Sequence, residues 1–261
     1  MTGSDRRVSA ALLVALVAGV VAFAWPLFHR PESGISAAQA PILFALVLPL
    51  VLAIVLSDLA GGRMDVKALA MLGVLAAVGT ILRPLSAGTA GFELIFFLMI
   101  LAGRVFGAGF GFALGAITLF TSALITSGVG PWLPYQMLTA GFVGLFAGWL
   151  PKATGRVELM LLAAYGMVSA FTYGWLMDFS FWPFAIGDGT QLSFDPAASP
   201  WENLHRFMLF NLATSMGWNL GRALTNAALV VLLGTTLLRL FRRTARQAAF
   251  VPLGSPAPLA E

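Results

Sequence analysis

The sequence SGVGPWLPYQ, residues 127–136, lies between two apolar runs at 107–126 and 135–150. Its two prolines fix two φ angles and its two glycines permit a tight turn, so the segment is a stiff connection between helices. Trp132 and Tyr135 are residue types that concentrate where a membrane meets water. The segment therefore predicts a membrane hairpin whose loop lies at the aqueous boundary. Such a loop is either one wall of a ligand site or simply a well-anchored turn.

The composition is that of a membrane protein. Of the 261 residues, 59% are hydrophobic and only 10% are charged, which is outside the range of soluble domains. The apolar runs continue for roughly 16 to 22 residues, the length of membrane-spanning helices, whereas the strands of a membrane barrel alternate polar and apolar residues. We therefore expect an all-α fold, a polytopic membrane helical bundle.

Several chemistries are disfavoured by what the sequence lacks. There is no cysteine, and the two histidines, His29 and His205, are too few for a histidine-built metal centre. We find no phosphate-binding glycine loop, no His-Glu-x-x-His pair and no Gly-x-Ser-x-Gly elbow. We expect no catalytic residues, no metal, no cofactor and no ATPase in this chain. The basic residues lie mostly at the ends of apolar runs, so membrane topology explains the high pI better than nucleic-acid binding does.

The apolar runs divide the chain into an N-terminal part and a core. Runs at 8–28 and 42–56 predict a transmembrane hairpin in residues 1–62. A signal peptide is the alternative interpretation of the first run, but its length of about 20 residues and the returning second run favour the hairpin. Residues 63–246 form the predicted six-helix core, and residues 247–261 are a predicted cytoplasmic tail. The whole chain would then have about eight transmembrane helices.

The six core helices are expected at residues 66–82, 92–103, 107–126, 135–150, 157–178 and 200–240. The helix at 92–103 is too short to cross a bilayer unaided, so neighbours must shield it or it must continue through Arg104. The last helix has a strong start signal, with Ser199 as N-cap, Pro200 at the first position and Glu202 in the first turn.

Lysine and arginine predict the orientation. If Arg6 and Arg7 are cytoplasmic, alternation through eight helices places eleven of the fifteen basic residues on the cytoplasmic side. Arg30, Arg83, Arg206 and Arg222 are the exceptions, outside or within the membrane. We therefore expect a multi-pass protein of the plasma membrane with both termini in the cytoplasm. Its loops at 83–91, 127–136 and 179–199 would face outward.

One group of polar residues lies within the last apolar run. Asn219, Arg222 and Asn226 are spaced i, i+3, i+7, which places them on one helix face. A guanidinium at that depth needs a partner, and we expect Glu93 first and Asp178 second. The group is either the polar floor of a ligand cavity or a set of bridges between helices.

Aromatic and small residues suggest two further surfaces. The outward loop at 179–199 begins with an aromatic cluster containing Trp182, which either lies in the lipid interface or covers a pocket as a lid. Glycines at 107, 111 and 115 form a small-residue face that either packs within the protein or meets a partner subunit.

Four segments resemble the substrate-binding S components of energy-coupling factor (ECF) vitamin transporters. They are FFLMILAGRVFG (96–107), GFGFALGA (109–116), GVGPWLPYQM (128–137) and GWNLGRALTN (217–226), the last resembling actinobacterial members. The resemblance extends over roughly residues 66–246. It implies a six-helix core that binds a vitamin or related micronutrient from outside and docks on a transmembrane coupling subunit driven by two cytoplasmic ATPases. Cobalamin or a precursor is the ligand that the resemblance suggests.

The resemblance and the residue patterns together define the expected sites. Substrate-binding residues are expected at Glu93, Trp132, Tyr135, Gln136, Asp178, Trp182, Asn219, Arg222 and Asn226. The resemblance implies a small-xxx-small coupling face on the first core helix. Gly73 and Ala77 keep that spacing and Ala70 and Thr80 lie one turn away, so coupling-subunit contacts are expected at these four residues. The alternatives are a membrane scaffold or assembly subunit without a ligand, and an intramembrane enzyme that uses Asp178, Glu93 and Arg222.

Overall fold

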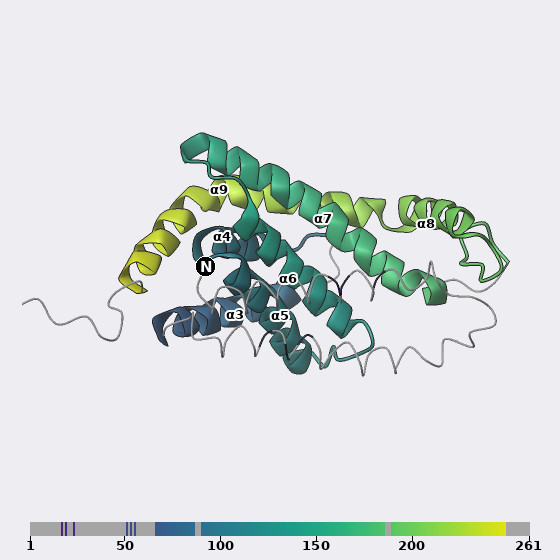
Figure 1. The fold of residues 1–261 in the computed structure, drawn as a ribbon, viewed down its shortest axis with the longest axis horizontal. Coiled ribbons are helices and arrows are strands. Elements are labelled where there is room, and N and C mark those ends of the chain that lie inside the picture. Colours follow the sequence, from purple (N-terminus) through teal and green to yellow (C-terminus); the bar gives the residue numbers. More distant parts are fainter. Residues whose placement is uncertain are drawn as a thin grey trace, which may run out of the picture.

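The computed structural model describes residues 66–86, 90–185 and 189–248, together with single positions at 17, 19, 23, 51, 53 and 55. Its helices are α3 (Val66–Ser86), α4 (Phe96–Phe106), α5 (Ala108–Ile125), α6 (Leu133–Trp149), α7 (Gly155–Ala185), α8 (Pro200–Thr214) and α9 (Met216–Ala248). The described part contains helices and no strand, which confirms the all-α class (Figure 1). The predicted hairpin at 8–28 and 42–56 and nearly all of the predicted tail lie outside the described residues.

Four helical segments are long and apolar enough to cross a membrane: Val66–Ser86, Ala108–Ile125, Gly155–Pro183 and Met216–Arg246. They indicate a helical membrane protein. The sequence predicts about eight transmembrane helices, and four of the described helices are long and apolar enough to be among them.

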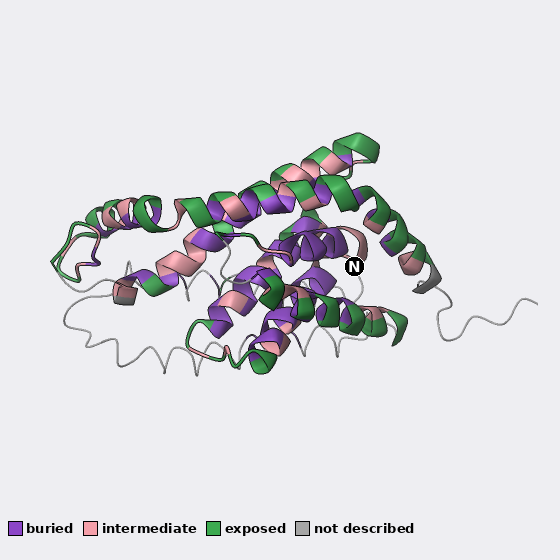
Figure 2. Cartoon of the chain, turned by 180° about the vertical axis from the view of Figure 1, so that it is seen from behind, coloured by how far each residue is buried: buried purple, intermediate pink, exposed green. Residues whose placement is uncertain are grey.

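Helix α4 lies at the centre of the bundle. It packs against α5, α6, α7 and α9, and its residues 96–103 are all buried (Figure 2). At 1.5 Å per residue its 11 residues extend about 16 Å, roughly half the thickness of the hydrocarbon core. Neighbouring helices therefore shield α4, and it continues through Arg104 to Phe106. The predicted start at residue 92 is wrong, because residues 92–95 are not helical.

Helices α5 and α6 touch through their backbones. A Cβ atom added at Gly111 would lie 2.3 Å from the carbonyl oxygen of Gly144, and one added at Gly144 would lie 2.2 Å from that of Gly111. At Gly115 the corresponding distance to the oxygen of Ala140 is 2.3 Å. No side chain fits at these positions, so internal packing is the correct interpretation of Gly111 and Gly115. Gly107 lies in the connection between α4 and α5, with open space beside it.

The single last helix predicted at 200–240 is wrong. The structure has two helices, α8 and α9, which are separated at Ser215. The Thr214 hydroxyl donates to the carbonyl of Phe210 at 2.8 Å, and the Ser215 N–H donates to that of Asn211. A hydroxyl that bonds back to a preceding carbonyl often bends a helix, and at Ser215 the backbone departs from helical values, with φ −121°. The predicted start is confirmed, because the Ser199 hydroxyl accepts from the Glu202 N–H at 3.3 Å.

Helix α7 continues to Ala185 rather than ending at residue 178, so the first part of the expected outward loop is helical. The cause is tertiary packing. Trp182 is 1% exposed, contacts the rings of Phe194 and Phe207, and donates its indole N–H to the carbonyl of Leu192 at 2.7 Å. This aromatic cluster joins α7 to α8 and fixes the end of the helix.

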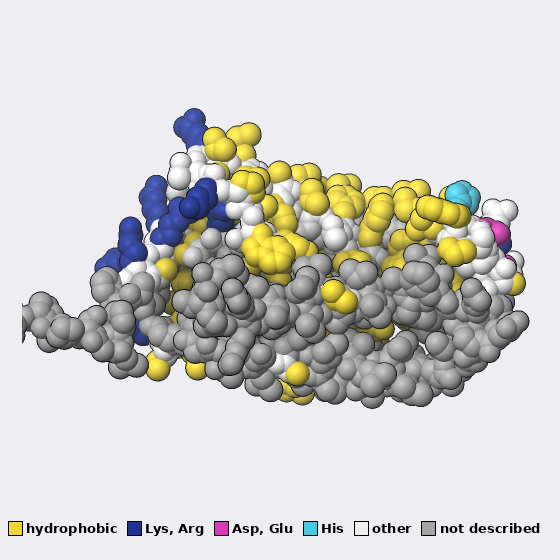
Figure 3. Space-filling view, in the orientation of Figure 1, with side chains coloured by type: hydrophobic (Ala, Val, Ile, Leu, Met, Phe, Trp, Pro, Cys, Tyr) yellow, Lys and Arg dark blue, Asp and Glu magenta, His cyan; other side chains and the backbone are white. Residues whose placement is uncertain are grey.

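Basic side chains gather at one end of the molecule, where α7 begins and α9 ends (Figure 3). We call it the basic end; its exposed residues include Lys152, Arg156, Arg239, Arg242, Arg243 and Arg246. Inside this end, the buried Glu158 carboxylate accepts from Arg104 Nε at 2.8 Å and from Arg242 Nη2 at 2.6 Å. Helix α8 lies at the opposite end.

Candidate functional site

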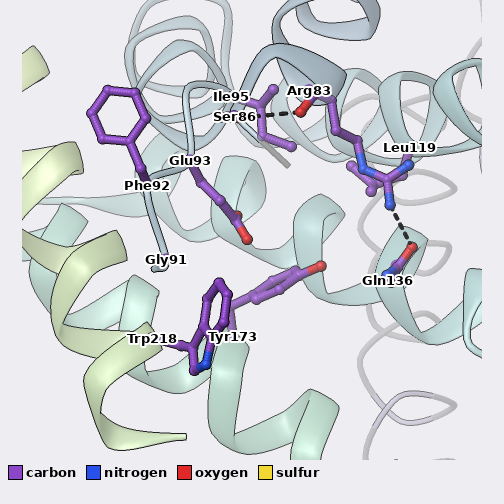
Figure 4. A pocket seen from close by; sticks show the side chains of 10 residues that line it. All are labelled: Arg83, Ser86, Gly91, Phe92, Glu93, Ile95, Leu119, Gln136, Tyr173 and Trp218. Carbon is purple, nitrogen blue, oxygen red and sulfur yellow. Dashed lines mark hydrogen bonds between the residues drawn. The ribbon is translucent and has the colours of Figure 1, made fainter. Parts of the chain in front are cut away.

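A cavity of about 230 Å³ lies among the helices (Figure 4). Arg83 and Ser86 reach it from the end of α3, Gln136 from the start of α6, Tyr173 from α7 and Trp218 from the start of α9. Leu119 of α5 and the non-helical segment 91–95 complete the lining. The cavity can hold several water molecules or a small organic molecule.

Segment 90–95 enters the bundle by lying directly on α9. Gly91 has a φ of +81°, and a Cβ atom there would lie 2.0 Å from the carbonyl oxygen of Trp218. A Cβ at Gly221, one turn further along α9, would lie 2.1 Å from the oxygen of Ala90. Only glycine permits both contacts. This approach brings Glu93, two residues after Gly91, to the middle of the bundle.

Glu93 forms the predicted ion pair with Arg222. The distance from Arg222 Nη2 to Glu93 Oε1 is 3.0 Å, and Arg222 Nη1 donates to Asn219 Oδ1 at 2.9 Å. Arg222 is 8% exposed, and its guanidinium lies 5.0 Å from the centre of the Tyr173 ring. A buried guanidinium is costly without such partners. Arg222 therefore fixes the Glu93 carboxylate at the wall of the cavity, and Asn219 accepts a hydrogen bond that orients Arg222.

Arg83 is the second guanidinium of the site. Its Nη2 donates to Gln136 Oε1 at 3.0 Å and its Nη1 to Ser122 Oγ at 3.3 Å. Within the described ranges, no carboxylate lies within 4.0 Å of it. Figure 4 shows Arg83 and Gln136 at one end of the cavity and Glu93 with Trp218 at the other. The cavity therefore has a positive end and an end where the charges are paired.

The sequence prediction missed Arg83, Ser86, Tyr173 and Trp218 as lining residues. For Arg83 a signal was present, because an ionisable residue at the end of an apolar run is a candidate functional residue. The charge bias gives Arg83 only as an exception, outside or within the membrane, and predicts no site for it. No spacing distinguishes Tyr173 and Trp218 from the other aromatic residues of their helices.

Of the nine predicted binding residues, Glu93 and Gln136 line the cavity and the other seven do not. Four of the seven make their contacts in other parts of the structure. Trp132 is 47% exposed and donates its indole N–H to the carbonyl of Gly128. The Tyr135 ring packs on Phe23, with centroids 5.2 Å apart. Asp178 accepts a hydrogen bond from the Asn211 amide of α8. Trp182 belongs to the aromatic cluster at the end of α7.

Asn226 lies further along α9, with its Nδ2 3.5 Å from the carbonyl of Gly166. Its Oδ1 is buried and has no hydrogen-bond partner among the described residues. It is not one of the lining residues. Asn219 and Arg222 are not lining residues either. Arg222 is linked to the cavity through its ion pair with Glu93.

The predicted coupling residues divide between two faces of α3. Ala70, Gly73 and Ala77 are exposed, and nothing lies within 4 Å of a Cβ added at Gly73. Thr80 is buried instead, with its hydroxyl 2.6 Å from that of Thr121 in α5.

In the part of the chain that the structure describes, histidine, aspartate and glutamate form no group of three that could hold a metal ion. Comparison of the chain with protein-family models, with curated proteins and with solved structures finds no match. A functional proposal therefore rests on the chain's own residues and on the resemblance of its segments.

Proposed function

We propose that the chain is the substrate-binding S subunit of an ECF-type importer. It would capture a vitamin or related micronutrient from outside and deliver it through a coupling subunit driven by two ATPases. One observation carries the proposal: an apolar helical bundle encloses a cavity whose lining includes Arg83, Glu93, Tyr173 and Trp218. Ionisable residues within membrane helices are costly and are retained where a substrate passes or binds.

The charge distribution supports the proposed orientation. Lysine and arginine accumulate on the cytoplasmic side of membrane proteins, so the basic end is assigned to the cytoplasm. The cavity is formed by the end of α3 and the starts of α6 and α9, and α9 ends at the basic end. The cavity therefore belongs on the outer side. With the hairpin that the sequence predicts at residues 8–28 and 42–56, helices α3 to α7 and α9 would make eight spans in the plasma membrane, and both termini would be cytoplasmic.

Ligand capture in this cavity uses two kinds of contact. Tyr173 and Trp218 supply apolar surface, and Arg83, Gln136 and Glu93 supply hydrogen bonds. A corrinoid such as cobalamin is far larger than this space, so the cavity favours a smaller micronutrient.

The exposed face of α3, which points away from the helical bundle, is the proposed contact with the coupling subunit. Ala70, Gly73 and Ala77 lie on it and allow another helix to approach closely. Thr80 takes no part in this face, because it is buried against Thr121.

Purification of the complex tests the proposal. The full chain is expressed with its native ATPase and coupling partners, purified in detergent, and its bound small molecules are identified by mass spectrometry. An ATPase pair together with a bound micronutrient supports the importer. Partners without any ligand would instead support the scaffold alternative, and turnover of a substrate by the lone chain would support an intramembrane enzyme.

A further inference from the structure

We infer that the cavity binds a small organic carboxylate with a single negative charge, whose carboxylate contacts Arg83 and whose other end donates a hydrogen bond to Glu93. The inference rests on the proposed function as a ligand receptor and specifies its substrate class. It follows from the charges, the hydrogen bonds and the size of the cavity.

The charges of the cavity leave one positive charge without a partner. Glu93 and Arg222 form an ion pair and neutralise each other. Arg83 has no carboxylate within 4.0 Å in residues 66–86, 90–185 and 189–248. A ligand with one negative charge would therefore bring the net charge of the cavity to zero. A neutral or cationic ligand leaves the guanidinium unpaired when water is displaced, which is costly in an apolar bundle.

The guanidinium is held ready for a carboxylate. Gln136 and Ser122 accept two of its N–H groups, and a guanidinium has five in a rigid planar fork. The two bonds fix the plane of the fork and leave other N–H groups for the cavity. Arginine binds carboxylates through two parallel hydrogen bonds, which makes the pair strong and directional.

The opposite end offers an acceptor. Arg222 occupies Glu93 Oε1, and the Glu93 side chain remains 29% exposed. Its carboxylate points toward the interior of the cavity in Figure 4, above the rings of Tyr173 and Trp218. A ligand N–H or O–H group can donate to this carboxylate while the body of the ligand packs on the two rings.

Matched carboxylate and amide probes test the inference. Three pairs keep a hydrogen-bond donor at the far end and replace the carboxylate with a neutral amide: 4-aminobenzoate and 4-aminobenzamide, 4-hydroxybenzoate and 4-hydroxybenzamide, 6-hydroxyhexanoate and 6-hydroxyhexanamide. Isothermal titration calorimetry on the purified full chain in detergent measures each Kd. We expect the best carboxylate to bind about 10- to 100-fold more tightly than its amide, the ratio given by a charge-assisted hydrogen bond. Arg83→Gln should abolish that preference.

The control is Arg206→Gln. Arg206 is an exposed arginine of α8 that pairs with Glu202, outside the cavity, so the preference should remain. If no carboxylate is preferred over its amide, or if the preference survives Arg83→Gln in folded protein, the inference is overturned. A neutral or cationic molecule bound to the natively purified chain would overturn the substrate class but leave the receptor function standing. Absence of any bound small molecule in the complete complex would instead remove the proposed function.

Discussion

Removing the charge of Glu93 should destabilise the protein through Arg222. Glu93→Gln keeps the size of the side chain and removes the carboxylate 3.0 Å from Arg222 Nη2. Breaking a fully buried ion pair costs roughly 3 to 5 kcal/mol. Here the cost is smaller, because the Glu93 side chain is already 29% exposed to solvent. In the variant the Arg222 guanidinium also keeps its hydrogen bond to Asn219. We expect the free energy of unfolding to fall by about 2 kcal/mol.

A double-mutant cycle measures the interaction itself. Glu93→Gln, Arg222→Gln and the double variant are unfolded by titrating SDS into the detergent-solubilised protein while helicity is followed by circular dichroism. We expect a coupling energy of about 1.5 to 2 kcal/mol, within the range for residues that share a hydrogen bond.

An exposed ion pair provides the control. Arg206 and Glu202, spaced i, i+4 on α8, have side chains 24% and 52% exposed, and such pairs contribute about 0.3 to 0.5 kcal/mol. If the effects of the Glu93 and Arg222 substitutions add to within about 0.5 kcal/mol, the two residues act independently and the account of the site is refuted.

Three further predictions concern binding, packing and assembly. Arg222→Ala should weaken ligand binding without changing membrane insertion, measured by calorimetry and by the amount of protein in the membrane fraction; unchanged affinity would remove Arg222 from the site. Gly144→Ala should lower the free energy of unfolding by about 1 to 3 kcal/mol, because its Cβ would lie 2.2 Å from the backbone of Gly111, whereas Gly217→Ala, with nothing within 4 Å, should be harmless in the same SDS titration. Gly73→Leu should reduce co-purification of the coupling subunit while Gly217→Leu does not; equal recovery with both variants would exclude the α3 face as the contact.

Much of the fold was predictable because uninterrupted apolar runs determine membrane helices. The runs at 66–82, 107–126 and 135–150 correspond to α3, α5 and α6 with ends that differ by four residues or fewer. The Glu93–Arg222 pair was also predictable, since a guanidinium within an apolar run requires a carboxylate and few are available.

The rest depends on tertiary contacts that no local pattern specifies. Helix α7 extends to Ala185 because Trp182 is buried against residues of α8 and the preceding loop. The role of Arg83 depends on how α3 packs against α5, because this packing lets the Arg83 side chain donate to Ser122 of α5 and reach Gln136 of α6. In the sequence alone, Arg83 does not differ from a residue that marks the end of a membrane span.

The cavity follows from the shortness of α4. Its 11 residues extend only about half the hydrocarbon thickness, and the chain before it, residues 91–95, is non-helical and lies against the cavity. Non-helical backbone at that depth has polar groups that need partners, and it is tolerated only where protein or a cavity surrounds it. The Leu94 N–H, for example, donates to the Ser86 hydroxyl at 3.4 Å, at the wall of the cavity. The short central helix thus creates the polar space, the contact of Gly91 with α9 places Glu93 in it, and Arg83 determines the charge of what it can hold.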